Sequence, residues 1–371
     1  MTREAVFEAS TEYFLGPISE YLRDESVTEI MVNGWDQVYV ERFGRLELTD
    51  VRFADDDALL SAINNIAQWV GREINPQRPI LEARLPDGSR VHAILPPAAN
   101  GGIYLTIRKF SRRGLTLQDL VRFGTLSPTA REYLELCVRL RKNILISGGT
   151  GTGKTSLLGA LSAAIPAEER IIVIEDTSEL RLQQPHCLYL EAQADDAAGQ
   201  HARSVRPLFI ASLRMRPDRI ILGEVRAGEA LDMVQAMLSG HAGSLSTIHA
   251  NTPRDALIRL ETLSLMSDVE LPVYVARSQV AAAIHLVVQL ARFPEDGSRR
   301  VTHISEVHGL SADNQYQTRD LFLSRSHGRG PDGKLNVELK PTGTLATFSA
   351  EAFQQGLESR VQWTKELWTK S

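Results

Sequence analysis

The chain has 371 residues, more than one compact core usually covers, so two or three domains of about 100–200 residues each are expected. Its 41 Lys and Arg against 46 Asp and Glu give a net charge of −5, which argues against a protein built mainly to coat nucleic acid. Two cysteines exclude a disulfide framework and a four-thiolate zinc site, and they fit a reducing compartment. No apolar run approaches the roughly 18 residues of a membrane span, and the chain opens without a signal-peptide pattern, so a cytoplasmic protein is expected.

The first part of the chain, residues 1–110, predicts an N-terminal α+β module. A helical stripe of apolar residues follows Asp55 and stops at Gly71. Short strand patterns with glycine-containing turns lie on both sides of it. Residues 111–115 are expected to be a linker, because 111–114 are polar and end in a glycine.

Strand patterns alternate with helical patterns in residues 116–310, which predicts an α/β domain with a mainly parallel sheet covered on both faces. Within it, strands are expected at 144–147, 171–174, 219–222 and 244–248. We interpret residues 311–371 as a C-terminal extension. Its stretch 349–367 has apolar residues at the spacing of an amphipathic helix, namely Phe353, Leu357, Val361 and Leu367.

A glycine-rich segment follows the first of these strands and precedes a helix. It reads Gly148-Gly149-Thr150-Gly151-Thr152-Gly153-Lys154-Thr155 and is followed by Ser156. This is the phosphate-binding pattern G-x-x-x-x-G-K-[ST], whose glycines let backbone N–H groups curl around phosphate oxygens. Lys154 can reach the β and γ phosphates, and Thr155 can ligate Mg²⁺. The segment therefore predicts a site for ATP and Mg²⁺.

Two neighbouring strand patterns end in carboxylates that could orient an attacking water. The first strand ends in Glu175 and Asp176, and the second in Gly223 and Glu224. Glycine occupies the place where this kind of strand usually carries the Mg²⁺-linked Asp, so Glu175 or Asp176 is the natural substitute. We interpret Glu224 as the catalytic base, against the alternative of a structural ion pair with Arg226. The same structural alternative applies to Glu175 and Asp176.

Three further side chains are candidates for contacting the terminal phosphate. Arg214 and Arg226 flank the second carboxylate strand, and guanidinium groups stabilise the charge that phosphoryl transfer spreads over oxygens. His249 follows the strand pattern at 244–248, at the end where open α/β sheets bind ligands. The alternatives are solvated surface arginines and a histidine that is satisfied within the core. A zinc role is not expected, because His249 lacks partner cysteines.

Taken together, four segments resemble the four conserved boxes of the type II and type IV secretion ATPase superfamily. These are the phosphate-binding segment 148–155, the acidic segment 174–180, the segment 213–226 and the histidine segment 246–251. Within the superfamily, 216–219, 227–233 and 251–257 look like the Flp (Tad) pilus assembly ATPases, the CpaF-like branch. The N-terminal segments 85–92 and 106–110 look like the corresponding module of that branch.

The resemblance implies a RecA-like P-loop ATPase domain behind an N-terminal module, assembled into a homo-hexameric ring. It also implies that arginines of the N-terminal module face the nucleotide phosphates, and Arg84, Arg90 and Arg108 match those arginines. A plain surface role is the alternative for all three. The implied function is a cytoplasmic ATPase that docks on an inner-membrane platform protein, peripheral to the membrane, and powers pilus assembly or protein secretion.

Three other functions stay open. A conjugative type IV secretion ATPase would share all four boxes. A nucleic-acid motor would share the phosphate-binding segment, although a pI near 6.0 does not favour it and no direct nucleic-acid partner is expected. A nucleotide-gated scaffold would bind ATP without turning it over, and the presence of Glu224 argues against that reading.

Overall fold

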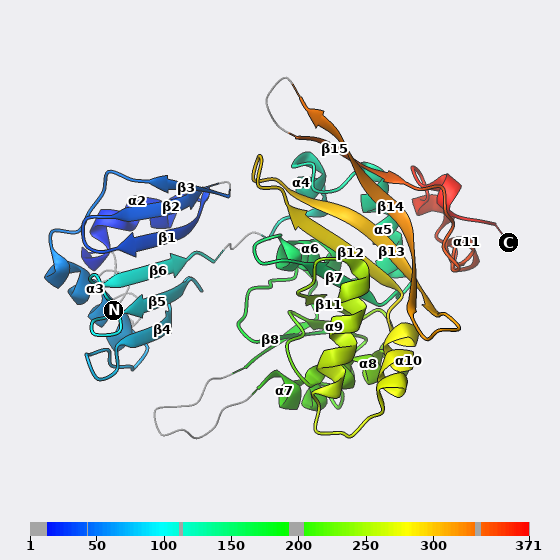
Figure 1. The fold of residues 1–371 in the computed structure, drawn as a ribbon, viewed down its shortest axis with the longest axis horizontal. Helices are drawn as coiled ribbons and strands as arrows, with labels where there is room; N and C mark the ends of the chain where they lie inside the picture. The colour runs from blue at the N-terminus through cyan, green and yellow to red at the C-terminus, as the bar shows by residue number, and fades with distance from the viewer. Residues whose placement is uncertain (1–12, 43, 111–113, 193–203, 331–334, 371) are drawn as a thin grey trace. The chain divides into compact units, whose positions relative to one another are not determined.

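The computed structural model divides the chain into two compact units, Met1–Arg112 and Arg113–Ser371 (Figure 1). It describes residues 13–42, 44–110, 114–192, 204–330 and 335–370. Most of the predicted linker, residues 111–113, lies outside the described residues. Residues 311–330 and 335–370 belong to the second unit, so the predicted C-terminal extension is part of the same compact body as the α/β domain.

The first unit is a six-stranded antiparallel sheet in the order β3-β2-β1-β6-β5-β4, packed against helix α3. Asp55 accepts a hydrogen bond from the backbone N–H of Ala58 at 2.8 Å and so caps the helix where the sequence predicts its start. Leu59, Ile63 and Ile66 of the helix are fully buried against the sheet. The elements are α2 (Ser19–Arg23), β1 (Val27–Asn33), β2 (Val38–Arg42), β3 (Arg45–Leu48), α3 (Asp56–Trp69), β4 (Ile80–Arg84), β5 (Arg90–Ile94) and β6 (Tyr104–Arg108).

The second unit is built on a nine-stranded sheet in the order β15-β14-β13-β12-β7-β11-β10-β8-β9. The six strands from β12 to β9 run parallel, and β12 to β15 continue as an antiparallel meander. Its strands are β7 (Ile144–Gly148), β8 (Ile171–Glu175), β9 (Cys187–Glu191), β10 (Arg219–Leu222), β11 (Leu245–Ile248), β12 (Leu286–Arg292), β13 (Arg299–Leu310), β14 (Tyr316–Arg329) and β15 (Leu335–Pro341). The predicted α/β class with a mainly parallel sheet is confirmed.

Helices cover both faces of this sheet. Along β7, Ile144 and Ile146 pack into the core under α4, α5 and α6, while Leu145 faces the core under α7 to α10. This alternation follows from the two-residue period of a strand, and burial on both sides explains the continuous apolar run. The helices are α4 (Leu117–Arg122), α5 (Pro128–Arg139), α6 (Lys154–Ser162), α7 (Val205–Ser212), α8 (Glu229–Leu238), α9 (Pro253–Leu265) and α10 (Val273–Ala283).

The C-terminal segment differs from its prediction. In place of one amphipathic helix over 349–367, the structure has a four-residue helix and two 3-10 turns: α11 (Glu351–Gln354), η2 (Glu358–Arg360) and η3 (Lys365–Leu367). Long-range contacts break the helix: the buried carboxylate of Glu132 on α5 accepts three consecutive backbone N–H groups, from residues 362–364, at 2.9 to 3.0 Å. Trp368 also stacks on Tyr133 of α5, with ring centroids 5.1 Å apart.

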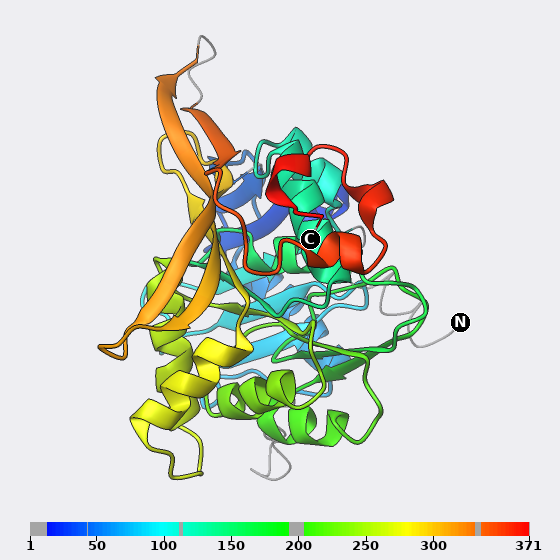
Figure 2. The same cartoon turned by 90° about the vertical axis from the view of Figure 1, so that its right-hand side faces the viewer.

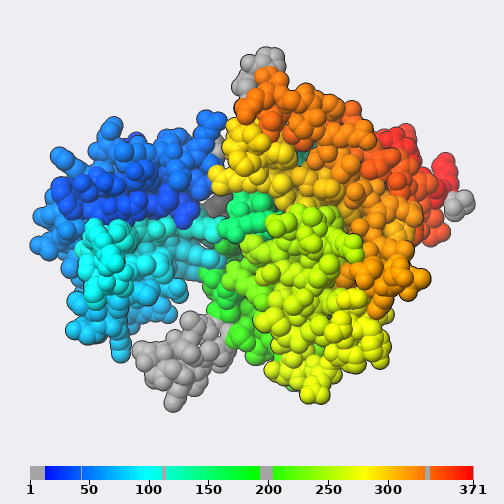
Figure 3. All heavy atoms as spheres, viewed as in Figure 1, coloured from blue at the N-terminus to red at the C-terminus, as the bar shows by residue number. Residues whose placement is uncertain are grey.

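The strands β14 and β15 form an arm that extends beyond the body of the second unit, as Figure 2 shows from the side. The space-filling view shows α9 and α10 packed against the strands of this meander in one continuous surface (Figure 3). Glu261 of α9 ties these elements together, because its carboxylate accepts hydrogen bonds from Arg277 of α10 and from the Tyr316 hydroxyl of β14, all at 2.8 Å.

Candidate nucleotide-binding site

The predicted phosphate-binding segment forms a loop between β7 and α6, here called the phosphate loop (residues 148–155). Gly151 and Gly153 have φ angles of +69° and +93°, which L-residues with side chains rarely adopt. Gly148 is required for a different reason: a Cβ atom there would lie 2.5 Å from the Thr152 hydroxyl and 2.9 Å from the carbonyl oxygen of Leu290. The pattern of glycines thus sets the path of the loop, and α6 begins directly after it at Lys154.

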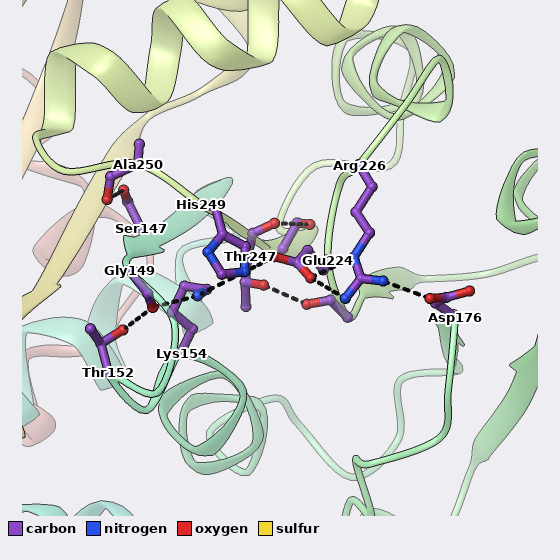
Figure 4. Close-up of polar contacts among 12 residues, drawn as sticks. Ser147, Gly149, Thr152, Lys154, Asp176, Glu224, Arg226, Thr247, His249 and Ala250 are labelled. Carbon is purple, nitrogen blue, oxygen red and sulfur yellow. Dashed lines mark hydrogen bonds and ion pairs between the residues drawn. The ribbon is translucent and has the colours of Figure 1, made fainter. Parts of the chain in front are cut away.

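Lys154 is buried with its ammonium group at the centre of the loop. It donates to the carbonyl of Gly149 at 2.9 Å and lies 3.4 Å from His249 Nε2 (Figure 4). Burial lowers its pKa, with Glu224 acting in the opposite direction. Thr155 and Ser156 occupy the first turn of α6, where backbone N–H groups and the helix dipole favour anions. These residues fit a bound polyphosphate, with the Thr155 hydroxyl available to Mg²⁺.

Glu224 lies at the end of β10 and is held between an imidazole and a guanidinium group. Its Oε1 is 2.7 Å from His249 Nε2, and its Oε2 is 2.7 Å from the guanidinium of Arg226 (Figure 4). Arg226 continues the chain of charges, because its Nη1 is 2.7 Å from Asp176 Oδ2. Burial and then the neighbouring Lys154 lower the pKa of His249. The structure therefore brings together five predicted residues: Lys154, His249, Glu224, Arg226 and Asp176.

Glu175 is engaged elsewhere. Its buried carboxylate accepts the backbone N–H groups of Glu179 at 3.0 Å and Leu180 at 3.1 Å, and burial raises its pKa to about 7. Its strand, β8, is three places from β7 in the sheet. The structure thus places Glu175 three strands from the phosphate loop but directly beside Gly223, and its role as the substitute for the metal-linked Asp stays a prediction.

The glycine that replaces this Asp has a packing reason. A Cβ atom on Gly223 would lie 2.8 Å from Cγ of Glu175, which is closer than real Cβ atoms approach other atoms. The Glu175 side chain fills the space that a side chain at position 223 would need. Strand β10 therefore accepts only glycine beside a long buried carboxylate on β8.

Arg214 is not brought to the phosphate loop in the second unit. It follows α7 and lies next to Met215, whose carbonyl accepts a hydrogen bond from Arg170 at 2.9 Å. Arg170 precedes β8, so this contact marks the edge of the parallel sheet where strands begin, whereas the phosphate loop lies where they end. These two ends of the sheet are separated by the length of β10, which is a strand of four residues (Arg219–Leu222). Arg214 thus lies at the opposite end of the strands from the phosphate loop of its own chain, and its role in sensing the γ-phosphate stays a prediction.

The three predicted arginines of the first unit lie on neighbouring strands. Arg84 on β4 is the register partner of Arg90 on β5, which is in turn the register partner of Arg108 on β6. The three residues therefore form one row at the ends of three adjacent strands of the antiparallel sheet. The register of the strands groups these arginines, and the sequence alone did not reveal that register.

Other residues at the site were missed by the sequence reasoning. Glu229 on α8 accepts the backbone N–H groups of Arg226 and Ala227, at 2.7 and 2.9 Å, and so shapes the loop after Glu224. Arg299 on β13 donates to the carbonyl of Gly151 at 2.8 Å. The turn at residues 295–297 was the signal that could have identified Arg299, because residues at equal distances from a hairpin turn lie opposite each other.

None of the described helices is long and apolar enough to cross a membrane. No group of three or more His, Cys, Asp or Glu side chains in the described part of the chain is arranged to hold a metal ion. Mg²⁺ that binds with a nucleotide usually takes its ligands from phosphate oxygens, water and one or two side chains, and the Thr155 hydroxyl is placed to be such a ligand.

A phosphate loop after one central strand of a parallel sheet, with a carboxylate at the end of a nearby strand, defines the P-loop nucleotide-binding proteins of RecA-like fold. The sequence matches the family model described as "Type II/IV secretion system protein" over residues 12–329. The chain belongs to this family of secretion ATPases.

Individual similarities agree with the family. The type IV secretion system protein PtlH of Bordetella pertussis is 37% identical over 321 residues, covering 79% of this chain and 94% of that protein. The type IV secretion system protein VirB11 of Brucella suis is 34% identical over 329 residues, covering 81% and 90%. The crystal structure of the pilus retraction motor PilT with bound ADP is similar in fold, with a TM-score of 0.57, 19% identity and coverage of 82% and 84%. The predicted superfamily is confirmed, while the narrower Flp (Tad) branch remains a prediction.

Proposed function

We propose that this protein hydrolyses ATP to power a type IV secretion machine. The observation that carries the proposal is the convergence of Lys154, Glu224 and His249 from three parallel strand ends on one point beside the phosphate loop. A cation to hold terminal phosphates and a carboxylate to orient water are the two parts that phosphoryl transfer to water requires.

In this mechanism, Lys154 exchanges its contact with the Gly149 carbonyl for the β and γ phosphate oxygens. Glu224 accepts a hydrogen bond from the attacking water and takes its proton. His249 and Arg226, which hold the two oxygens of Glu224, lie close enough to respond to the terminal phosphate. Mg²⁺, bound through the Thr155 hydroxyl, would neutralise the charge that develops on the phosphate oxygens. Asp176 supports this site through its ion pair with Arg226.

The working form is proposed to be a homo-hexamer, as the resemblance to the secretion ATPases implies. In that assembly Arg84, Arg90 and Arg108 bind nucleotide phosphates, and their row on one sheet edge supports a shared role. Phosphate oxygens favour several guanidinium groups, because each can donate two parallel hydrogen bonds. Nucleotide turnover then changes the arrangement of the two units of each chain.

The relatives favour a type IV secretion role at the cytoplasmic face of the membrane, where the protein binds an inner-membrane platform protein. A second candidate is assembly of a Flp (Tad) pilus, which is favoured by the segments 216–219, 227–233 and 251–257. A nucleic-acid motor is less well supported, since the net charge is −5. Stimulation of hydrolysis by single- or double-stranded DNA would support that third reading.

Phosphate release by the purified chain tests the enzymatic part of the proposal. We expect turnover by the unaltered protein, and loss of both ATP binding and turnover in Lys154→Ala, because the loop loses its only buried ammonium. Lys340→Ala on β15 is the matched control: it removes one exposed lysine from the arm and should leave both unchanged. Absence of turnover in the unaltered protein with intact ATP binding would favour a nucleotide-gated scaffold.

The cellular role requires a different experiment, namely mild crosslinking in cells followed by identification of the neighbouring membrane proteins. A coupling protein and a core channel would support type IV secretion. A pilin and a polytopic platform protein would support the pilus branch instead.

A further inference from the structure

The β12–β13 hairpin brings two arginines to the phosphate loop from the side opposite the catalytic carboxylate. Strand β12 pairs with β7, and Leu290 is the register partner of Gly148, the first residue of the loop. Beyond Leu290, Arg292 on β12 is the register partner of Arg299 on β13. Both positions therefore lie at the end of the sheet where the phosphate loop turns.

Contacts place these arginines against the tip of the loop. Arg299 Nε donates to the carbonyl oxygen of Gly151 at 2.8 Å. Its Cδ lies 3.6 Å from where a Cβ atom of Gly153 would be, and Arg292 Nη1 lies 3.8 Å from the corresponding point at Gly151. Both distances are ordinary van der Waals separations, so the two arginine side chains lie within contact range of the loop.

The hairpin turn that carries Arg299 is firmly supported. Asp296 accepts the backbone N–H of Ser298 at 2.9 Å and that of Leu335 at 3.0 Å. The adjacent Arg300 points the other way and donates to the carbonyl oxygens of Leu335 at 3.1 Å and Gly124 at 3.3 Å. Arg299 is therefore held beside the loop by a turn tied to β15 and to the end of α4, which is the kind of support that positions a ligand-binding side chain.

The direction of a bound nucleotide follows from the two sides of the loop. Lys154 points to His249 and Glu224, which belong to the β10–β11 side, so the proposed mechanism puts the terminal phosphate there. Strand β12 is the other neighbour of β7. The remainder of the nucleotide leaves the loop on the side of the β12–β13 hairpin.

We propose that Arg299, assisted by Arg292, binds the nucleotide at its α-phosphate and nucleoside end. This inference rests on the proposed function, because it assumes that the phosphate loop takes ADP and ATP. Guanidinium groups suit both parts of this end, since they donate to phosphate oxygens and stack on the flat face of a base. Such a contact is made equally to ATP and ADP, so it contributes to affinity and leaves the chemical step unchanged.

Binding of fluorescent ADP and ATP analogues to Arg299→Ala, with Mg²⁺ present, tests the proposal. We expect both dissociation constants to rise by the same factor, about tenfold for the loss of one charged contact, with kcat at saturating ATP changed less than twofold. Arg325→Ala, which removes an exposed arginine from β14, is the matched control and should change neither constant. Thermal unfolding of each variant checks that the fold is retained.

Arg299→Gln separates ligand binding from support of the loop. Glutamine keeps an N–H donor for the Gly151 carbonyl but has no charge, so the proposal predicts that it binds nucleotide as weakly as Arg299→Ala. Arg299→Lys, which keeps the charge, should recover part of the affinity. Recovery by Gln, a larger loss for ATP than for ADP, or unchanged affinity in Arg299→Ala would overturn the proposal. Failure of the unaltered chain to bind any nucleotide would instead remove the proposed function, and this inference with it.

Discussion

The ends of β8 and β10 lie side by side in the same sheet, and each carries a glutamate, yet the two sites are built in different ways. Glu175 at the end of β8 is bound by backbone N–H groups of its own following loop. Glu224, just beyond the end of β10, is bound by side chains, namely His249, which follows β11, and Arg226 of its own following loop. The first environment is fixed by the path of the chain, whereas the second can change when side chains move.

This difference separates a structural carboxylate from a reactive one. Backbone donors hold Glu175, so we expect its contribution to be to the loop that it closes. In the proposed mechanism, His249 and Arg226 turn toward a terminal phosphate, which frees an oxygen of Glu224 to orient water. We therefore expect identical residue types at equivalent strand ends to have different roles because of what donates to them.

Replacing Glu224 gives the largest expected effect. We expect Glu224→Gln to lower kcat by about 10²–10⁴-fold, the usual contribution of a general base, with ATP affinity changed only slightly. Glutamine keeps the size of the side chain and one oxygen for Arg226, so the fold is retained. Phosphate release and nucleotide binding measure the two quantities, and Glu338→Gln on the exposed arm is the control for loss of one carboxylate. Near-normal hydrolysis in Glu224→Gln would reject the assignment of the base.

Replacing Glu175 should instead change how stability depends on pH. The pKa of this group is about 7 in the folded protein, above its ordinary value of 4.5, so the folded state binds the proton more tightly than the unfolded state. The unaltered protein therefore loses stability from this group as the pH rises from about 4.5 to about 7, and no further above that. We expect Glu175→Gln to remove this loss, a relative gain on the order of 3 kcal/mol at pH 8.

Urea unfolding at pH 5 and pH 8 measures this gain as the difference between Glu175→Gln and the unaltered protein. Turnover at saturating ATP should fall far less than in Glu224→Gln. The same pH slope in both proteins would contradict the buried state of Glu175, and a loss of turnover as large as that of Glu224→Gln would contradict its structural role.

The smallest expected effect concerns the contact between the two strands. Gly223→Ala should destabilise the fold by about 1–3 kcal/mol, because its Cβ atom meets the Glu175 side chain. In a Glu175→Ala background the nearest atoms, Cγ and Oε1, are absent, so Gly223→Ala should lower the free energy of unfolding much less. A double-mutant cycle from urea unfolding gives this coupling. Equal costs in the two backgrounds would show that the glycine is required for another reason.

Much of the second unit could be predicted from its sequence, because local signals decide its central elements. The strands β7, β8 and β10 are continuous apolar runs, and Thr116 with Asp119 forms a capping box at the start of α4. The sequence pattern does not separate helix α10 from strand β12, because their apolar residues join in one stretch that fits either structure. The C-terminal segment was misread because its apolar spacing is helical, while the buried Glu132 captures its N–H groups from a distance.

The candidate site divides in the same way. The sequence was sufficient to predict Lys154, Glu224 and His249, because each lies in a segment whose motif or position at a strand end indicates its role. Arg299 reaches the loop only through hairpin register, which connects it to a residue 148 positions away. Arg214 was placed near the site because it precedes a catalytic strand, but the residues that precede a parallel strand lie at its opposite end.

The contact between Glu132 and the C-terminal segment also sets a limit on where the chain can be shortened. Four donors satisfy that buried carboxylate, three backbone N–H groups of residues 362–364 and the Thr364 hydroxyl at 2.7 Å. A chain ending before them would leave a desolvated charge at the centre of α5 and would uncover Tyr133, at a cost on the order of 3–5 kcal/mol for the charge alone. The segment 352–368 thus adds buried side chains to the core under α5, namely Ala352, Val361, Leu367 and Trp368, and its removal would open that core to water.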